Sequence, residues 1–527
     1  MVARLRAVTV LGLAGLLFSA CALADVRDAV SGGQTLRLRG AEPITLDPAF
    51  STDSASWSYI IQIHAGLVRL DNDLSIVPDI AESWSIDRGG TEYTFRIREN
   101  VRFHDGRDIT ASDFTYGLER NLSPITKSPV AAGYLGDIVG AAELRAGRAS
   151  RLAGVEAIDA RTLRIRIDGA KPYFLAKLAF PTAFVLDRAN VESGPDWWRR
   201  PNGAGPFKLE NLIASERVTL RRHNGYWAGS ANLTTLEFDT GPVPGVALYE
   251  QGHVDGAEVD LASIDRMMDR RTGYRKELVE TALLSTWYIG LNSTVAPFDD
   301  ELVRRAFAQA TDRDRIARVF FRGTRRAASS IVPPDLPGAT PATAIGFDAR
   351  RARETLAASR YARAMPEITL AVGPGSASVG AALAEMYTRN LGIEVGVREW
   401  DEEFFQALEG RSAPLFLTGW IADYPDPENF LDILFHSRSI HNYAGVTDPD
   451  LDRMLVEART EPDRERRSRL YQDAERMILD HATAIPLYHE TSRVLIKPYV
   501  RNLRVTPLGI LDFRHVGVGD RPRASAP

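Results

Sequence analysis

The sequence contains very little cysteine: Cys21 is the only one among 527 residues. One cysteine cannot form a disulfide within the chain, so the protein does not belong to the class of secreted proteins that are held together by disulfides. Stability must come from a hydrophobic core. The content of 44% hydrophobic and 25% charged residues is ordinary for a globular protein of two or three domains.

Long hydrophobic runs are also scarce. One apolar run, residues 7–18, follows two arginines and precedes small residues that end at Ala24. The run is shorter than the roughly 20 residues that a membrane-spanning helix needs, and its layout is typical of a secretory signal peptide. We therefore expect segment 1–24 to be removed and the mature protein to be periplasmic. A lipid anchor on Cys21 is the alternative.

Motifs of catalysis and nucleotide binding are missing. The chain has no Gly-x-Ser-x-Gly elbow, no His-Glu-x-x-His pair, no phosphate loop and no dinucleotide fingerprint after a strand. We therefore expect no enzymatic activity and no cofactor. A secreted hydrolase with a pair of carboxylates is the remaining enzyme alternative, because such pairs leave little trace in a sequence.

A strong charge of one sign is absent, since the formal net charge is only −5. This argues against nucleic acid or an anionic membrane surface as the main partner. The nine histidines are scattered. His436 and His441 form the closest pair, but their spacing does not place them on one helical face. We therefore expect no metal site.

Patterns of strands and helices mix along the whole chain. Apolar and polar residues alternate, as in strands, over 34–40, 93–98, 101–103, 154–158, 162–167, 218–222 and 236–238. The pairs 93–98 with 101–103 and 154–158 with 162–167 are expected to be adjacent strands. Helical patterns cover 56–65, 108–122, 303–321 and 450–458, and Thr110 with Asp113 is a capping signal. Without a repeat or a low-complexity linker, these elements predict α/β lobes.

A dozen short segments carry a more specific signal. They are 42–48, 66–68, 77–84, 93–95, 101–106, 110–114, 202–207, 224–227, 297–298, 303–306, 312–313 and Gly419-Trp-Ile-Ala-Asp-Tyr-Pro-Asp-Pro427. In wording and order these segments resemble family 5 of the extracytoplasmic solute-binding proteins, the oligopeptide- and dipeptide-binding group. The resemblance covers nearly all of the mature chain.

The resemblance implies an α/β, two-lobed fold of the periplasmic-binding-protein type (type II), with an extra domain in the first lobe. Carried onto this sequence, lobe I is 25–51, 184–285 and 488–527, the extra domain is 52–183, and lobe II is 286–487. The two chain crossings then act as a hinge, and a ligand that touches both lobes favours the closed state.

The resemblance also implies a function, the capture of short peptides for the membrane permease of an ABC importer by a monomeric protein. A peptide of arbitrary sequence offers only its termini and main chain as constant handles, and strand addition uses the main chain. In relatives the segment matching Gly419 to Asp423 does this. The main chain at Gly419 and Ile421 pairs with the ligand, and the carboxylate at Asp423 holds its α-ammonium group, because a buried ammonium needs an opposite charge.

Four further residues are candidates for ligand contact. Trp420 and Trp400 are expected to line side-chain pockets, with ordinary packing as the alternative. The segment with Glu42 and Ile44 matches the edge of lobe I that faces the ligand in relatives. Pro43 cannot donate a backbone hydrogen bond, so a structural turn is the alternative there.

The sequence also departs from some relatives. Leu417 occupies a place where some peptide binders carry an arginine, so the residue that holds the C-terminal carboxylate of the ligand is unassigned. Other ligands of this fold stay open: an oligosaccharide or opine-like sugar, a nickel complex, or haem. A chemosensor is an alternative partner to the permease, because either would recognise the closed lobes.

Overall fold

The computed structural model describes residues 34–339, 341–401 and 403–521. The expected signal peptide and Cys21 lie outside these ranges. Among the described residues, no helix combines the length and the apolar character that a membrane crossing needs.

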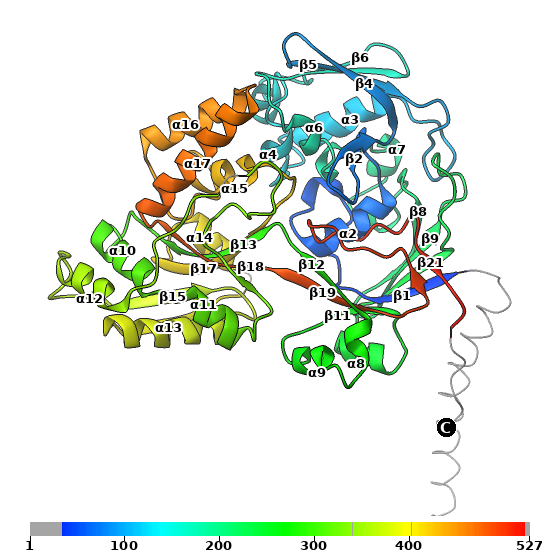
Figure 1. Cartoon of the computed structure of the whole chain (residues 1–527). Helices are drawn as coiled ribbons and strands as arrows, with labels where there is room; N and C mark the ends of the chain where they lie inside the picture. Colours follow the sequence, from blue (N-terminus) through cyan, green and yellow to red (C-terminus); the bar gives the residue numbers. More distant parts are fainter. Residues whose placement is uncertain (1–33, 340, 402, 522–527) are drawn as a thin grey trace, which may run out of the picture.

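Lobe I is built on a seven-stranded mixed sheet with strand order β12, β19, β11, β1, β10, β9, β8. Its strands are β1 (Thr35–Arg39), β8 (Phe207–Ile213), β9 (Arg217–Arg222), β10 (Thr235–Asp239), β11 (Gly256–Glu258), β12 (Leu278–Ala282) and β19 (Thr491–Ile496). The alternation in β1 buries Leu36 and Leu38 in a core that also receives Tyr59 and Ile63 from α2 (Ser54–Ile63). Helices α8 (Gly245–Glu250) and α9 (Ile264–Met268) lie at the lower end of this lobe (Figure 1).

Lobe II is built on a six-stranded sheet with strand order β14, β18, β13, β17, β15, β16. Its strands are β13 (Ser285–Leu291), β14 (Arg326–Ala327), β15 (Ile368–Val372), β16 (Val395–Glu399), β17 (Leu415–Ile421) and β18 (Ala484–His489). On one side lie α10 (Glu301–Ala310), α12 (Ala349–Ala357) and α13 (Ala377–Leu391), and on the other α15 (Glu428–Phe435), α16 (Pro449–Thr460) and α17 (Arg464–Asp480) (Figure 1). Two hydrophobic cores result, one on each face.

The elements from β2 (Val68–Leu70) to α6 (Phe174–Lys177), which fall in the predicted extra domain, lie above lobe I in Figure 1. Its four-stranded antiparallel sheet has the order β4 (Ala81–Asp87), β5 (Glu92–Ile97), β7 (Thr162–Arg166), β6 (Val155–Ala157). The predicted hairpin is confirmed as β6 and β7, which pair antiparallel. The predicted cap is confirmed too, since α3 (Ala111–Leu122) begins after Thr110 with a capping box to Asp113.

The predicted pairing of 93–98 with 101–103 is wrong. The strand at 93–98 is β5, and its neighbours in the sheet are β4 and β7. Val101 and Phe103 are buried in the core of the extra domain, and Arg102 forms only an isolated bridge with Asp108. The alternation of residues is real, but partners from farther along the chain form the sheet.

The predicted helix over 303–321 is interrupted. Helix α10 ends at Ala310, and Thr311 adopts an extended backbone conformation. The carboxylate of Asp312 then accepts a hydrogen bond from the backbone N–H of Arg315 and begins a new helical segment. A local capping residue thus overrides the helical periodicity.

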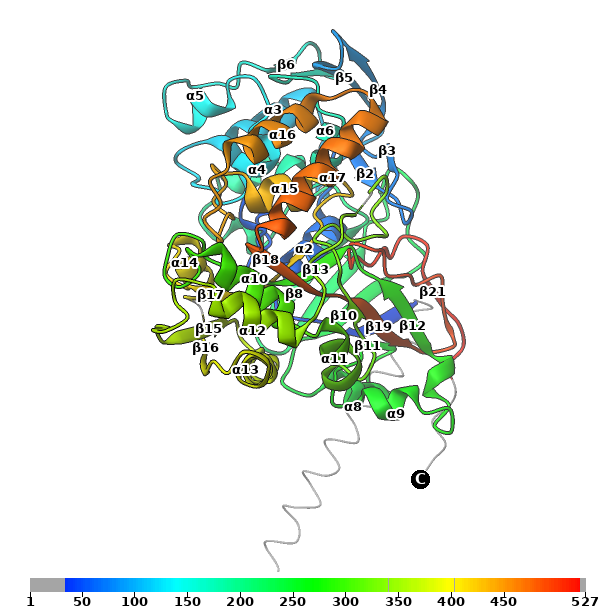
Figure 2. The same cartoon turned by 60° about the vertical axis from the view of Figure 1, so that its left-hand side comes forward.

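The chain passes between the lobes at two places that lie beside each other. It leaves lobe I after β12 and enters lobe II at β13, and it returns between β18 and β19. The backbone N–H of Leu283 donates to the carbonyl of Glu490 at 3.0 Å, so the two crossings are hydrogen-bonded to each other. Figures 1 and 2 show β18 and β19 as a nearly continuous ribbon from one lobe to the other. The exact lobe boundaries given above stay predictions.

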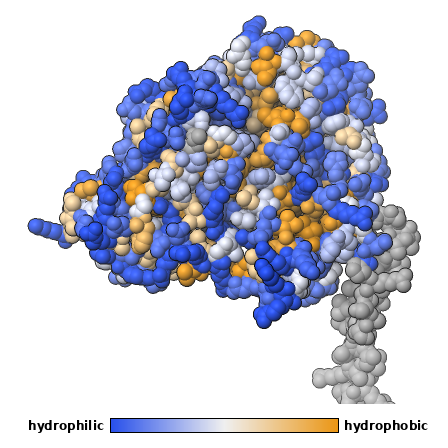
Figure 3. Space-filling view, in the orientation of Figure 1, coloured by the Kyte–Doolittle hydropathy of each residue, from blue (hydrophilic) through white to orange (hydrophobic). Residues whose placement is uncertain are grey.

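The surface reflects this division into parts. In Figure 3 hydrophobic residues gather in a broken band down the face, whereas its outer edges are mostly hydrophilic. Such a band is expected where parts of a molecule meet and leave an opening for a ligand.

Candidate functional site

Asp423 lies just beyond the end of β17, where lobe II meets the extra domain. The Asn429 side chain holds it from α15: the backbone N–H of Asp423 donates to Asn429 Oδ1 at 3.0 Å, and Asn429 Nδ2 donates to Asp423 Oδ2 at 3.1 Å. The hydroxyl of Tyr134, from α4 (Ala131–Leu135) of the extra domain, also hydrogen-bonds to the carboxylate. Both parts of the molecule therefore position this carboxylate.

No cationic side chain neutralises Asp423 directly. Within the described ranges it forms no ion pair, and burial raises its pKa to about 6, although hydrogen bonds from Asn429 and Tyr134 and the charge of Lys177 act in the opposite direction. A partly buried carboxylate in this state is stabilised by an opposite charge at hydrogen-bond distance. Its geometry suits a bound ammonium group.

The last residues of β17 have a strand partner on one side only. Strand β13 pairs along the whole of β17, whereas β15 pairs only with its first three residues. The backbone N–H of Ala422 donates to the carbonyl of Leu284, so even-numbered residues point their backbone groups toward β13. Gly419 and Ile421 consequently point theirs to the opposite edge. That edge has no strand partner in the part of the chain that the structure describes.

The two tryptophans near this edge are held by other side chains. Trp420 Nε1 donates to Asn429 Oδ1 at 3.0 Å. The guanidinium of Arg398 lies 3.8 Å above the ring of Trp400, whose buried Nε1 has no hydrogen-bond partner among the described residues. Neither tryptophan lines the cavity described below, and their contact with a ligand stays a prediction.

The two candidates in lobe I lie in the loop after β1. The carboxylate of Glu42 accepts a hydrogen bond from the backbone N–H of Ser215 at 3.0 Å. The side chain of Ile44 is 72% exposed, but its backbone N–H already donates to Ser56 Oγ at 3.0 Å. Any pairing of a ligand with Ile44 therefore has only its carbonyl available in this arrangement.

A cavity that is partly open to solvent lies between lobe I and the extra domain and reaches lobe II at Asp423. Of the residues predicted from the sequence, only Asp423 lines it. The wall is made of Trp57, Ile61, Gln62, His64, Ala65, Arg69, Leu70, Asp71, Asn72, Leu74, Asp79, Ala179, Phe184, Pro206, Tyr226, Thr506, Leu508, Ile510, Leu511, Asp512 and Arg514. Residues of lobe I, the extra domain and lobe II thus line one cavity.

Comparison with known proteins decides the family. The model of the bacterial extracellular solute-binding proteins, family 5 (middle), matches residues 75–442. The chain belongs to this family. It is thus a member of a class of solute-binding proteins, which is not a class of enzymes.

Three relatives show how far the likeness extends. The chain is 30% identical over 483 residues, 87% of its length and 88% of the relative's, to YgiS of Escherichia coli, described as a probable deoxycholate-binding periplasmic protein. It is 29% identical over 506 residues, 92% of each chain, to the periplasmic oligopeptide-binding protein OppA of Salmonella typhimurium. The structure of the Escherichia coli murein tripeptide binding protein MppA superposes with a TM-score of 0.83 at 26% identity, over 93% of this chain and 99% of that one.

The arrangement of the lobes can be compared with a second structure of MppA, its unliganded open form. The TM-score with the open form is 0.74, over 92% of this chain and 97% of that one, against 0.83 with the first structure. The structure of this family 5 protein therefore resembles the open form of MppA less than it resembles the first MppA structure.

The contact between lobe II and the extra domain centres on Tyr424. This side chain is fully buried and belongs to the hydrophobic core of the extra domain, although it comes from lobe II. Its ring is stacked on that of Tyr173 with centroids 6.1 Å apart, and its hydroxyl donates to Glu428. One aromatic side chain of lobe II thus packs inside the hydrophobic core of the extra domain.

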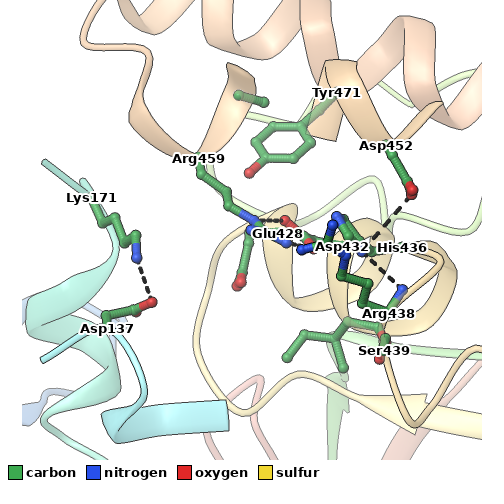
Figure 4. A network of polar contacts seen from close by, with 12 residues as sticks. Asp137, Lys171, Glu428, Asp432, His436, Arg438, Ser439, Asp452, Arg459 and Tyr471 are labelled. Carbon is green, nitrogen blue, oxygen red and sulfur yellow. Dashed lines mark hydrogen bonds and ion pairs between the residues drawn. The ribbon is translucent and has the colours of Figure 1, made fainter. Parts of the chain in front are cut away.

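A group of paired charges surrounds Tyr424, and we call Asp137, Lys171, Lys177 and Glu428 the junction network. Lys177 Nζ lies 3.0 Å from Asp137 Oδ2 and 3.7 Å from Glu428 Oε1, and Lys171 Nζ lies 2.6 Å from Asp137 Oδ1. Figure 4 shows Asp137 and Lys171 across the junction from Glu428, behind which Arg459 pairs with Asp432. The extra domain and lobe II thus share one network.

The electrostatics of the junction network follow from burial and pairing. Burial alone would lower the pKa of Lys177, but Glu428 and Asp137 raise it. Burial raises the pKa of Glu428 to about 7, although Lys177 lowers it. Burial would also raise the pKa of Asp137, but Lys177 and Lys171 lower it. Lys177 therefore stays charged because acids on both sides of the junction surround it.

Several residues of the site were not predicted from the sequence. Asn429 follows the family motif directly, and its place six residues after Asp423 at the start of a helix is a signal that could have been used. Tyr134, Arg69 and Lys177 belong to the extra domain, far from the motif in sequence, and nothing local to them indicates the junction. Among the described residues, no group of three or more His, Cys, Asp or Glu side chains could hold a metal ion.

Proposed function

We propose that this protein captures short peptides between its lobes and delivers them to the membrane permease of an ABC importer. The observation that carries the proposal is Asp423, a partly buried carboxylate without an ion-pair partner among the described residues, next to the strand edge at Gly419 and Ile421 that no described strand covers. Two relatives named as binding oligopeptides or a murein tripeptide support it.

In this proposal the α-ammonium group of the peptide binds Asp423, and its main chain pairs with the backbone of Gly419 and Ile421. Both contacts are the same for every peptide, so the sequence of the ligand is left to the cavity walls. Residues of lobe I, the extra domain and lobe II line one cavity, so a bound peptide would favour the arrangement in which they are together.

The location and assembly complete the proposal. Segment 1–24 exports the chain, as in relatives named periplasmic, and the mature protein acts as a monomer. A tether through Cys21 would place the same function at the membrane surface.

A bile acid such as deoxycholate is the second candidate ligand. It is favoured by the likeness to YgiS and by the apolar part of the cavity wall, which includes Trp57, Leu70 and Phe184. Such a ligand has a carboxylate but no ammonium group, and Asp423 would then repel it.

The test is a thermal-shift titration of protein from which bound ligand has been stripped by unfolding and refolding. A pool of tripeptides and tetrapeptides, the same pool N-acetylated, and deoxycholate are compared. Ligand at about 100 times its dissociation constant stabilises the folded state by roughly 2.7 kcal/mol. We expect only the free peptides to raise the melting temperature. A shift with deoxycholate and none with peptides would assign the second ligand.

Asp423→Asn is the matching variant, because it removes the charge and keeps the shape. We expect it to fold and to lose the shift with free peptides, with affinity reduced about 30-fold or more, since an ammonium loses its charged partner. Asp473→Asn, an exposed carboxylate of lobe II, is the control and should bind as the wild type does. Equal binding by Asp423→Asn would contradict the proposal.

A further inference from the structure

The cavity wall contains an arginine, Arg69, whose side chain forms no ion pair within the described chain. The side chain of Arg69, in β2, forms no ion pair or hydrogen bond with a described residue, and its Nε atom is buried without a partner among them. Burial lowers the pKa of Arg69 and the positive charge of Arg514 acts in the same direction, whereas the more distant Asp79 and Asp512 offset part of this effect. An unpaired guanidinium away from bulk water is unfavourable, and a bound anion would remove that cost.

The carboxylates near Arg69 are already engaged with other groups. Asp512 accepts two hydrogen bonds from the guanidinium of Arg514, at 2.8 Å to Oδ1 and 2.5 Å to Oδ2. Asp79 accepts a hydrogen bond from the hydroxyl of Tyr226 at 3.5 Å, and burial raises its pKa. Neither acid lies within ion-pair distance of Arg69. The guanidinium at this end of the cavity can therefore bind an anionic group of a ligand.

Other polar groups without partners face the same space. Both ring nitrogens of His64 and Nε1 of Trp57 are buried without a hydrogen-bond partner among the described residues, and both residues line the cavity. Buried polar groups are rarely left unpaired in folded proteins. A polar ligand group at the Arg69 end would supply partners that the chain itself does not.

Arg69 and Asp423 belong to different parts of the molecule but line one cavity. Arg69 comes from the extra domain and Asp423 from lobe II. We propose that this cavity selects peptides with a carboxylate close to their α-ammonium group, with Asp423 holding the ammonium and Arg69 the carboxylate. The inference rests on the proposed function and assigns the side-chain preference that the sequence left open.

Two sources can supply such a carboxylate: an acidic side chain in the first two residues, or the C-terminus of a dipeptide. Calorimetric titrations with matched pairs separate them. Ala-Glu-Ala-amide against Ala-Gln-Ala-amide, and Glu-Ala-Ala-amide against Gln-Ala-Ala-amide, test the side chain. Ala-Ala against Ala-Ala-amide tests the C-terminus. We expect the acidic member of at least one pair to bind roughly 10-fold tighter or more.

Arg69→Met is the variant that decides the residue. It should reduce the preference for the acidic member to less than about twofold while neutral peptides bind as before. Because it removes an unpaired charge, it should melt at the wild-type temperature or above, so loss of folding does not obscure the result. Arg96→Met removes an exposed charge from the same domain and should keep the preference.

The outcomes separate the two proposals. If neutral peptides with a free ammonium group bind as tightly as acidic ones, or if Arg69→Met keeps the preference, the inference about Arg69 is wrong and the proposed function stands. If no peptide binds the stripped protein, both are wrong.

Discussion

Two groups of charges lie near the contacts of the extra domain with the two lobes, and they differ in how they are paired. In the junction network each charged group has a partner within the protein, with Lys177 between Asp137 and Glu428. In the cavity Asp423 and Arg69 have none among the described residues. Buried charges are costly unless they are paired, so the first group serves stability and the second is suited to a ligand.

Lobe II and the extra domain can be held together in two ways. Tyr424 and Lys177 connect lobe II and the extra domain by direct contacts between side chains of the protein. The cavity residues would connect them only through a bound molecule. Substitutions in the first group should therefore change stability, and those in the second should change affinity.

The largest expected effect is that of Lys177→Met on stability. Removing Lys177 leaves Glu428 buried without its cation, and breaking one side of a buried ion pair typically costs about 3 to 5 kcal/mol. Because the pKa of Glu428 is already raised to about 7, its protonation will offset part of this cost, and we expect about 3 kcal/mol in urea denaturation at pH 7. Arg389→Met, which breaks an exposed pair with Glu385, should cost less than about 0.5 kcal/mol.

If Lys177→Met and Arg389→Met lowered the free energy of unfolding by the same small amount, the distinction between the two groups of charges would be wrong. The measurement is made without ligand, because a bound peptide would add its own stabilisation. The peptide affinity of Lys177→Met is measured separately, in buffer without urea.

The next effect is the pH dependence of peptide affinity. With a pKa of about 6, Asp423 is mostly ionised at pH 7 and mostly protonated at pH 5, and only the ionised form attracts an ammonium group. Affinity for a free tripeptide should fall about tenfold between pH 7 and pH 5. Calorimetry at the two values checks this, and Asp423→Asn should show no such change.

The same shift predicts the opposite trend for the ligand-free protein. A carboxyl whose pKa is raised on folding makes the folded state lose stability as the pH rises from about 4 through 6. The Asn variant lacks this contribution. Glu428, whose pKa is also raised, titrates closer to pH 7, so a trend that persists in Asp423→Asn belongs to the junction network.

The smallest effect is that of Tyr424→Phe. The ring keeps its place in the core of the extra domain, but Glu428 loses the hydrogen bond from the hydroxyl. We expect a loss of about 1 kcal/mol in stability and little change in peptide affinity. Tyr361→Phe removes an exposed hydroxyl bond to Asp299 and should cost less than about 0.5 kcal/mol. A larger loss of affinity than of stability in Tyr424→Phe would place Tyr424 in the ligand site.

The sequence predicted what is encoded over short distances along the chain. The cap at Thr110 and the hairpin of β6 and β7 involve neighbours, and the structure confirms both. The pairing of β5 was predicted wrongly. Its strand partners depend on packing in a hydrophobic core whose residues come from segments far apart in the sequence. The same limit applies to Arg69, which lines the same cavity as Asp423 only because of the fold.

The site could be predicted in part for the same reason. A family motif of nine residues indicated Asp423 and the edge of β17, and the structure leaves that edge without a partner in the described chain. What the motif could not indicate is which side chains beyond it are paired. The hydrogen bond from the backbone of Ile44 to the side chain of Ser56, and the lack of a partner for the Arg69 side chain among the described residues, are properties of three-dimensional packing.

The two adjacent crossings between the lobes have a mechanical consequence. Because Leu283 and Glu490 are hydrogen-bonded, both passages share one axis, and a rotation about it displaces each atom in proportion to its distance from that axis. Strands beside the axis stay in register, while the helices at the outer end of the long arm travel farthest. A small change of angle at the axis would thus produce a large displacement at the rim of the molecule.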